Sequence, residues 1–291
     1  MRALVFGETG QVARELALTA ATRGVAARFL GRAAADLTDP EACVRAIAAA
    51  DADVVVNAAA YTAVDRAEDE PALARTVNAT APGAMAVAAA AKGVPFFHLS
   101  TDYVFDGAPG RAWREADPTG PLGAYGASKR AGEEAVAGAT PDHVILRTAW
   151  VFSAHGANFV KTMLRVGRGK PEMRVVGDQR GGPTAARDIA NALWTIAEAW
   201  RDGRGEAGVF HYAGAPACTW ADFAEAIFAA SGWEAPPAVI RIATADWPTP
   251  AARPANSVLD CTRIAATYGI VQPDWREGLA AVVAELAGAE A

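Results

Sequence analysis

Residues 3–13 read Ala-Leu-Val-Phe-Gly-Glu-Thr-Gly-Gln-Val-Ala, and they predict how the fold of this chain begins. The first four residues form an apolar run typical of a buried strand, and the residues after the run repeat apolar side chains at helical spacing. Between them, Gly7, Gly10 and Ala13 have the G-x-x-G-x-x-A spacing of a dinucleotide-binding turn. Gly7 permits the tight turn, Gly10 lets the backbone approach a pyrophosphate, and Ala13 allows close packing of helix on strand.

Apolar runs and helical patterns alternate beyond this turn. Strands are expected at 2–6, 25–30, 53–57, 94–99 and 143–148, and helices at 11–22, 40–49, 71–92 and 122–138. This alternation predicts an α/β fold, a Rossmann-type doubly wound parallel sheet. We expect residues 1–148 to form the dinucleotide-binding domain and residues 149–291 mainly a smaller C-terminal substrate-binding lobe, with some later elements returning to the sheet.

The second half has a less regular pattern. Helices are expected at 156–167, 185–201, 219–230 and 274–287. The stretch 232–256 is rich in proline and shows little periodicity, so we expect a loop-rich cap there.

Composition excludes several classes of protein. The net charge of -6 over 291 residues gives no support to nucleic-acid binding, and no apolar run approaches the ~18 residues that a membrane span requires. The three cysteines are scattered and lack metal-ligand spacing, which indicates buried free thiols in a reducing compartment. We therefore expect a cytoplasmic protein that binds neither nucleic acid nor membrane.

Tyr125 and Lys129 stand four residues apart in the run YGASK. On a helix, this spacing places both side chains on one face. A fixed ammonium beside a phenol lowers the pKa of the tyrosine from about 10, so that the phenol can exchange protons with a carbonyl or alcohol oxygen. The same spacing occurs on ordinary solvent-facing helices, and only the glycine-rich turn favours the catalytic interpretation.

Polar groups follow three predicted strands where ligands bind in open α/β sheets. These groups begin the runs Asn57-Ala58-Ala59-Ala60, Ser100-Thr101-Asp102-Tyr103 and Arg147-Thr148-Ala149-Trp150. Each run alone is compatible with loop chemistry, but together they predict a binding crevice along one edge of the sheet.

Seven runs, spread over nearly the whole chain, carry a resemblance to a known family. They are FGETGQVA at 6–13, DLTD at 36–39, VVNAAAYTAVDRAE at 55–68, STDYVFDG at 100–107, YGASK at 125–129, LRTAWVF at 146–152 and RPANS at 253–257. The chain resembles the extended short-chain dehydrogenase/reductases, and within them the dTDP-4-dehydrorhamnose reductase family. The resemblance implies reduction of the C4 keto group of dTDP-4-dehydro-β-L-rhamnose by a reduced nicotinamide, giving dTDP-β-L-rhamnose.

The resemblance also implies roles for individual residues. Tyr125 would protonate the C4 oxygen, Lys129 would hold the nicotinamide ribose and lower the pKa of the tyrosine, and Thr101 would hydrogen-bond the reacting oxygen. The residues implied along the cofactor are Gly7, Gly10, Gln11, Val12, Asp36, Leu37, Ala58, Ala59 and Ala60, beside Tyr125 and Lys129. Those implied on the sugar nucleotide are Thr101, Asp102, Trp150, Arg253 and Asn256, with a surface salt bridge as the alternative for Arg253.

The second strand predicts the choice of cofactor. It ends Leu30-Gly31-Arg32, where many nicotinamide-binding domains have a carboxylate that holds the ribose 2′-hydroxyl. Glycine removes this carboxylate and Arg32 can supply a cation for a 2′-phosphate. We therefore predict NADPH over NADH, with a solvated Arg32 as the alternative.

Metal and assembly are less constrained by the sequence. Some members of the family have Mg²⁺ at a dimer contact, where Glu15 could be one ligand, but Ala190 stands where relatives carry an acid. The four histidines lack the spacing of a zinc site. We therefore predict no metal, and leave open whether the chain forms a homodimer.

Two other functions remain open from the sequence. One is a different nucleotide-sugar 4-ketoreductase or an epimerase, because the Tyr-Lys pair serves all of these enzymes. The other is a non-catalytic NADP-binding regulatory subunit, against which the retention of both Tyr125 and Lys129 argues.

Overall fold

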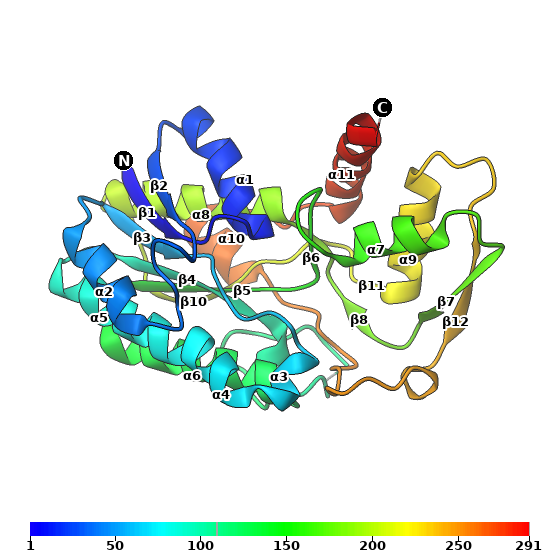
Figure 1. Cartoon of the computed structure of the whole chain (residues 1–291), viewed down its shortest axis with the longest axis horizontal. Coiled ribbons are helices and arrows are strands. Elements are labelled where there is room, and N and C mark those ends of the chain that lie inside the picture. The colour runs from blue at the N-terminus through cyan, green and yellow to red at the C-terminus, as the bar shows by residue number, and fades with distance from the viewer. Residues whose placement is uncertain (109, 291) are drawn as a thin grey trace.

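The central feature of the computed structural model is a six-stranded sheet (Figure 1). The model describes residues 1–108 and 110–290, with side chains described as far as residue 288. The strands are β1 (Arg2–Phe6), β2 (Ala26–Leu30), β3 (Val54–Asn57), β4 (Phe96–Thr101), β5 (His143–Thr148) and β10 (Gly208–His211). They lie in the order β10-β5-β4-β3-β1-β2, and every neighbouring pair is parallel. The predicted doubly wound parallel sheet is confirmed, and its order reverses between β1 and β3.

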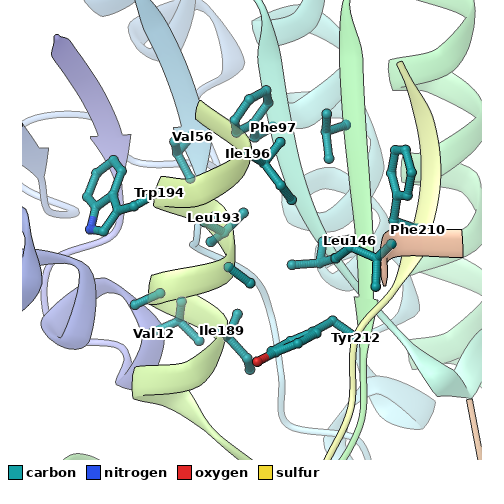
Figure 2. Close-up of a cluster of buried hydrophobic side chains, with 14 of the residues drawn as sticks. Val12, Val56, Phe97, Leu146, Ile189, Leu193, Trp194, Ile196, Phe210 and Tyr212 are labelled. Carbon is teal, nitrogen blue, oxygen red and sulfur yellow. The ribbon is translucent and has the colours of Figure 1, made fainter. Parts of the chain in front are cut away.

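Helices cover both faces of this sheet (Figure 1). On one face lie α1 (Gln11–Ala20), α8 (Ala186–Arg201) and α10 (Thr262–Tyr268), and on the other α2 (Pro40–Ala49), α5 (Ala81–Ala91) and α6 (Ala124–Ala139). Figure 2 shows α8 laying Ile189, Leu193 and Ile196 against strand residues of the first face. Phe210 of β10 and Tyr212, which follows this strand, complete this core.

One predicted helix is divided in the structure. The expected helix at 71–92 consists of α4 (Pro71–Arg75), a π-helical turn η2 (Thr76–Thr80) and α5. A short helix α3 (Arg66–Asp69) precedes them, and a 3-10 turn η1 (Ala21–Arg23) follows α1. Turns of this kind depend on tertiary packing and leave no separate periodicity in the sequence.

The second half supplies three helices that stand apart from the sheet. These are α7 (Phe159–Gly167), α9 (Trp220–Ala230) and α11 (Trp275–Glu290), which share a core with Phe152 and Val175. The parallel pair β7 (Glu172–Val176) and β12 (Ala238–Ile242) adds a second sheet. Shorter strands are β6 (Val151–Phe152), β8 (Arg180–Gly181), β9 (Thr184–Ala185) and β11 (Cys218–Thr219). β10 and α8 return to the central sheet, while the division of the chain at residue 148 stays a prediction.

The expectation of a loop-rich cap at 232–256 is wrong in part. This stretch contains β12 and a 3-10 turn η4 (Thr244–Asp246). The pairing partner of β12 lies more than sixty residues earlier, so local periodicity could not reveal it. Cys43, Cys218 and Cys261 are free and buried, as predicted. No helix within the described residues has the length and apolar character needed to cross a bilayer.

Candidate active site

The glycine-rich turn lies between β1 and α1 and faces the end of β3. Gly7 has a φ of +117°, and a methyl group on it would lie 3.2 Å from the Ala13 Cβ and 3.3 Å from the Ala58 backbone carbon. The turn is therefore packed as the spacing of its small residues predicted. The N-terminus of α1 has no side-chain cap and no acidic residue in its first turn, so its N–H groups are available to an anion.

The Gln11 side chain ties this turn to the second half of the chain. Its Oε1 accepts hydrogen bonds from the Ser153 hydroxyl at 3.0 Å and from the Asn158 amide at 2.9 Å. Val12, next in α1, is buried in the core beside α8. Sequence reasoning missed Ser153 and Asn158, because no local motif links them to a glycine turn more than 140 residues away.

The small residues after β3 form the other wall of the crevice. The Asn57 Oδ1 accepts a hydrogen bond from the Ala59 backbone N–H at 3.1 Å, and the Asn57 Nδ2 lies 3.1 Å from the His98 Nδ1. Ala58, Ala59 and Ala60 are all half-buried. The buried amide thus shapes the turn that carries these three residues past the glycine-rich loop.

Tyr125 lies in the first turn of α6 and faces a small cavity that Tyr103, Ala251 and Pro254 also line. Its ring meets the ring of Tyr103 edge to face, with centroids 5.8 Å apart. Burial raises the pKa of Tyr125 to about 12, and a hydrogen bond with Thr101 opposes this rise in part. The expectation that Lys129 lowers this pKa is wrong for this structure, because desolvation of the phenol raises the pKa and the charge of Asp102 raises it further.

Lys129 lies one turn beyond Tyr125 and is almost completely buried. Its Nζ donates a hydrogen bond to the Leu99 carbonyl at 2.7 Å and lies 3.2 Å from the His98 Nε2. Burial lowers the pKa of Lys129 to about 8, against the opposing influence of Glu133. His98 lies in the core of β4, as predicted, and burial next to the lysine holds its pKa well below the usual value.

Thr101 and Asp102 lie at the carboxyl end of β4. The Thr101 hydroxyl donates to the Asp102 Oδ1 at 2.9 Å and accepts from the Tyr103 backbone N–H at 3.2 Å. Burial raises the pKa of Asp102 to about 6, with the Thr101 hydrogen bond among the opposing contributions. The Asp102 Oδ2 is buried without a hydrogen-bond partner among the described residues. An unpaired buried oxygen beside Thr101 is suited to bind a polar ligand.

Trp150 follows β5 with a φ of +48°, which is unusual for a residue with a side chain. Its indole stacks on that of Trp220, with ring centroids 3.5 Å apart and planes 8° from parallel. The Trp220 Nε1 donates to the Gln179 Oε1 at 3.2 Å. Gly181 makes room for this arrangement, since a methyl group there would meet the indole of Trp150. No motif or spacing in the sequence indicated a role for Trp220 or Gln179.

Arg253 and Asn256 hold loops together in this structure. The Arg253 guanidinium pairs with the Asp65 carboxylate at 2.9 Å and donates to the Ala251 carbonyl at 2.9 Å. The Asn256 amide donates to the Arg111 carbonyl at 2.7 Å. The alternative salt-bridge interpretation of Arg253 is therefore realised, although the loop that carries it also lines the Tyr125 cavity.

The residues after β2 have mixed environments. The Arg32 side chain is 87% exposed, and its Nε lies 3.8 Å from the Asp36 carboxylate. A hydrogen bond from the Thr38 backbone N–H lowers the pKa of Asp36. Leu37 is buried in the core on the α2 face. The Leu37 side chain therefore packs beneath the segment that follows β2.

Some members of the resembled family have Mg²⁺ at a dimer contact. The residues around Glu15 in this chain do not fit such an ion. The buried Glu15 carboxylate accepts a hydrogen bond from the Arg187 Nε at 2.9 Å. Residue 190 is a buried alanine. Within the described part of the chain, no three potential ligands come together. An arginine of the same chain already supplies the positive charge next to this carboxylate.

The fold and this arrangement of side chains define the class. A doubly wound parallel sheet with a glycine-rich turn, and with Thr101, Tyr125 and Lys129 around the end of one strand, is that of an extended short-chain dehydrogenase/reductase. The chain belongs to the family described as the RmlD substrate binding domain, whose model matches residues 1–287.

Relatives of known name span nearly the whole chain. It is 46% identical over 284 residues to a dTDP-4-dehydrorhamnose reductase of Sinorhizobium fredii, covering 95% of each protein. A reductase of the same name from Burkholderia thailandensis is 45% identical, over 98% of this chain and 99% of the relative. The crystal structure of the Bacillus anthracis reductase in complex with NADP superposes with a TM-score of 0.91 at 30% identity, over 98% of this chain and 99% of that one.

Proposed function

We propose that this chain uses NADPH to reduce the C4 keto group of dTDP-4-dehydro-β-L-rhamnose, giving dTDP-β-L-rhamnose. The relatives at 45–46% identity carry the name of this reaction, and the Bacillus anthracis structure holds NADP. The observation that carries the proposal is the buried Lys129, one turn beyond Tyr125, whose Nζ donates to the Leu99 carbonyl at 2.7 Å beside the strand end that carries Thr101. This cluster can offer a proton at the strand end where a ketone would meet the cofactor.

The proton belongs to Tyr125. Reduction of a ketone requires a donor that is still protonated when hydride arrives, and a tyrosine with a pKa of about 12 keeps its proton at neutral pH. The alkoxide that forms at C4 then takes this proton from the phenol. A reduced nicotinamide supplies the hydride when it is bound.

Thr101 and Lys129 orient the reacting groups. The Thr101 hydroxyl is directed to Asp102, and rotation about its C–O bond allows it to donate to the ketone oxygen instead. The ammonium group of Lys129 contacts the Leu99 carbonyl and the His98 Nε2, which leaves one donor for the nicotinamide ribose. We assign Asp102, Trp150, Arg253 and Asn256 to the sugar-nucleotide side.

The cofactor would lie along the crevice between the two glycine- and alanine-rich turns. Its pyrophosphate would meet the N-terminus of α1, and its adenosine half would lie towards the end of β2. The residues assigned to it are Gly7, Gly10, Gln11, Val12, Arg32, Asp36, Leu37, Ala58, Ala59 and Ala60. Whether the chain forms a homodimer stays open, and size-exclusion chromatography tests it. A cytoplasmic location stays a prediction.

The experiment is an NADPH-oxidation assay on the purified chain. The 4-keto-L-rhamnosyl nucleotide is made in situ by an epimerase, and NMR determines the configuration of the product at C4. The expected product has the L-rhamno configuration. An L-talo product would identify a reductase of opposite stereochemistry, and cofactor binding without turnover would indicate a regulatory subunit.

A further inference from the structure

A carboxylate from the turn after β1 covers the glycine at the end of β2. A methyl group on Gly31 would collide with the Glu8 Oε2 and would lie 3.2 Å from the Glu8 Cδ. The turn is held at this place because the Gly7 backbone N–H donates to the Leu30 carbonyl at 2.9 Å. Glu8 is exposed and makes no hydrogen bond or ion pair with another described residue. Its carboxylate is therefore available to a ligand.

The end of β2 is the place where a Rossmann fold distinguishes the two nicotinamide cofactors. A carboxylate there accepts a hydrogen bond from the ribose 2′-hydroxyl of NADH, whereas an arginine accommodates the 2′-phosphate of NADPH. The absence of a carboxylate from Gly31 favoured NADPH in the sequence. The structure places a carboxylate at the same position from a different segment, because Glu8 lies in the turn after β1, 18 residues before β2 begins.

Arg32 supplies the opposite charge beside it. Its side chain extends into solvent and reaches the Asp36 carboxylate only at 3.8 Å. An exposed cation and a carboxylate thus both lie at the end of β2, where the adenosine ribose of a nicotinamide cofactor would bind. The cation favours a 2′-phosphate and the carboxylate opposes it by repulsion.

We infer that Glu8 determines cofactor selectivity in this chain, by limiting the preference for NADPH so that NADH is also accepted. The inference rests on the proposed function only in assuming that the chain binds a nicotinamide cofactor. It concerns the adenosine ribose and is independent of which ketone is reduced.

The test measures dissociation constants for NADPH and NADH by the fluorescence of the reduced cofactors, with no sugar nucleotide present. The wild-type chain is expected to bind the two cofactors within about tenfold of each other, because the Glu8 carboxylate opposes the 2′-phosphate that Arg32 favours. Glu8→Gln should raise the preference for NADPH by about fivefold, and Glu8→Lys should raise it further. Arg32→Ala should shift the preference towards NADH.

Glu134→Gln is the matched control, because Glu134 is an exposed carboxylate on α6. It should leave the ratio of the two dissociation constants unchanged. An unchanged ratio in Glu8→Gln would overturn the inference, as would a wild-type chain that excludes NADH by a hundredfold or more. Because no sugar is present, these outcomes are separate from failure of the proposed reduction, which appears only in the turnover assay.

Discussion

The Nζ of Lys129 and the backbone oxygen of Leu99 lie 2.7 Å apart, which joins helix α6 to strand β4. Leu99 precedes Thr101 by two residues, and Tyr125 lies one turn before the lysine. Together with the 3.2 Å contact between the Lys129 Nζ and the His98 Nε2, this hydrogen bond holds the helix that carries the phenol against the strand that carries the hydroxyl. The proposed proton donor is positioned through the backbone of β4.

Replacing Tyr125 by phenylalanine tests the proton donor. The ring remains to pack against Tyr103, but the proton for the C4 oxygen is lost. Turnover should fall by roughly 10²- to 10⁴-fold, the usual contribution of general acid–base catalysis. Cofactor titration should give a dissociation constant close to that of the wild type. Undiminished turnover would remove Tyr125 from the mechanism.

The buried pair of Glu133 and Arg147 should matter for stability. The two side chains form a bidentate pair at 2.8 and 2.6 Å and are 7% and 5% exposed. Glu133→Gln leaves a buried guanidinium without its counter-charge and should lower the free energy of unfolding by about 3–5 kcal/mol. Urea denaturation measures this change.

The control is Glu134→Gln, one residue further along α6. Glu134 pairs with Arg130 at 2.9 Å, but both side chains are largely exposed. Its loss should change the free energy of unfolding by less than about 0.5 kcal/mol. Equal effects of the two substitutions would mean that burial does not strengthen the Glu133 pair.

Asp102 should make stability depend on pH in the acid range. Its pKa is about 6 in the folded chain and near 3.8 when exposed, so the folded state binds more protons between these values. The stabilising contribution of the protonated carboxyl is complete below pH 3.8 and is lost as the pH rises through 6. Asp102→Asn should therefore gain stability over the wild type between pH 4 and 6, reaching on the order of 2 kcal/mol.

Thermal denaturation of both proteins across this pH range measures the effect. The amide can still accept from Thr101 through its Oδ1, so the comparison mainly removes the charge. A constant difference between the two proteins at every pH would contradict the assignment of a raised pKa to Asp102.

Removal of divalent ions should leave the protein unchanged. Arg187 already donates to the Glu15 carboxylate, so a chelator has no structural cation to extract there. The melting temperature should be the same with and without EDTA. Arg187→Ala should lower it, because the buried carboxylate then loses its partner. A chelator-induced drop in the wild-type melting temperature would refute this account.

The strands and helices of the first half could be predicted because a parallel sheet has a local sequence pattern. Its strands are short apolar runs separated by helices, and all five expected ones are present. β12 and β10 could not be predicted in the same way, since their partners β7 and β5 lie more than sixty residues away. The π-helical turn Thr76–Thr80 likewise contacts α6, where the Asn78 amide donates to the Ser128 hydroxyl at 2.9 Å.

Residue types in the candidate site were visible in the sequence, but their environments were not. The spacing of Tyr125 and Lys129 placed them on one helix face, yet burial reversed the expected direction of the tyrosine pKa shift. Trp220 came to lie on Trp150 only through the packing of α9. Likewise, the turn residue Glu8 reaches Gly31 only because the sheet brings β1 and β2 together.

β10 lies far along the chain from its partner strand β5, and this separation has a consequence for synthesis on the ribosome. β5 ends at residue 148, whereas the strand that covers its outer edge begins at residue 208. A growing chain released between these points would present β5 with unpaired backbone groups, which are a template for aggregation. Truncations that stop before residue 208 should therefore aggregate, even though they contain the glycine-rich turn, Tyr125 and Lys129.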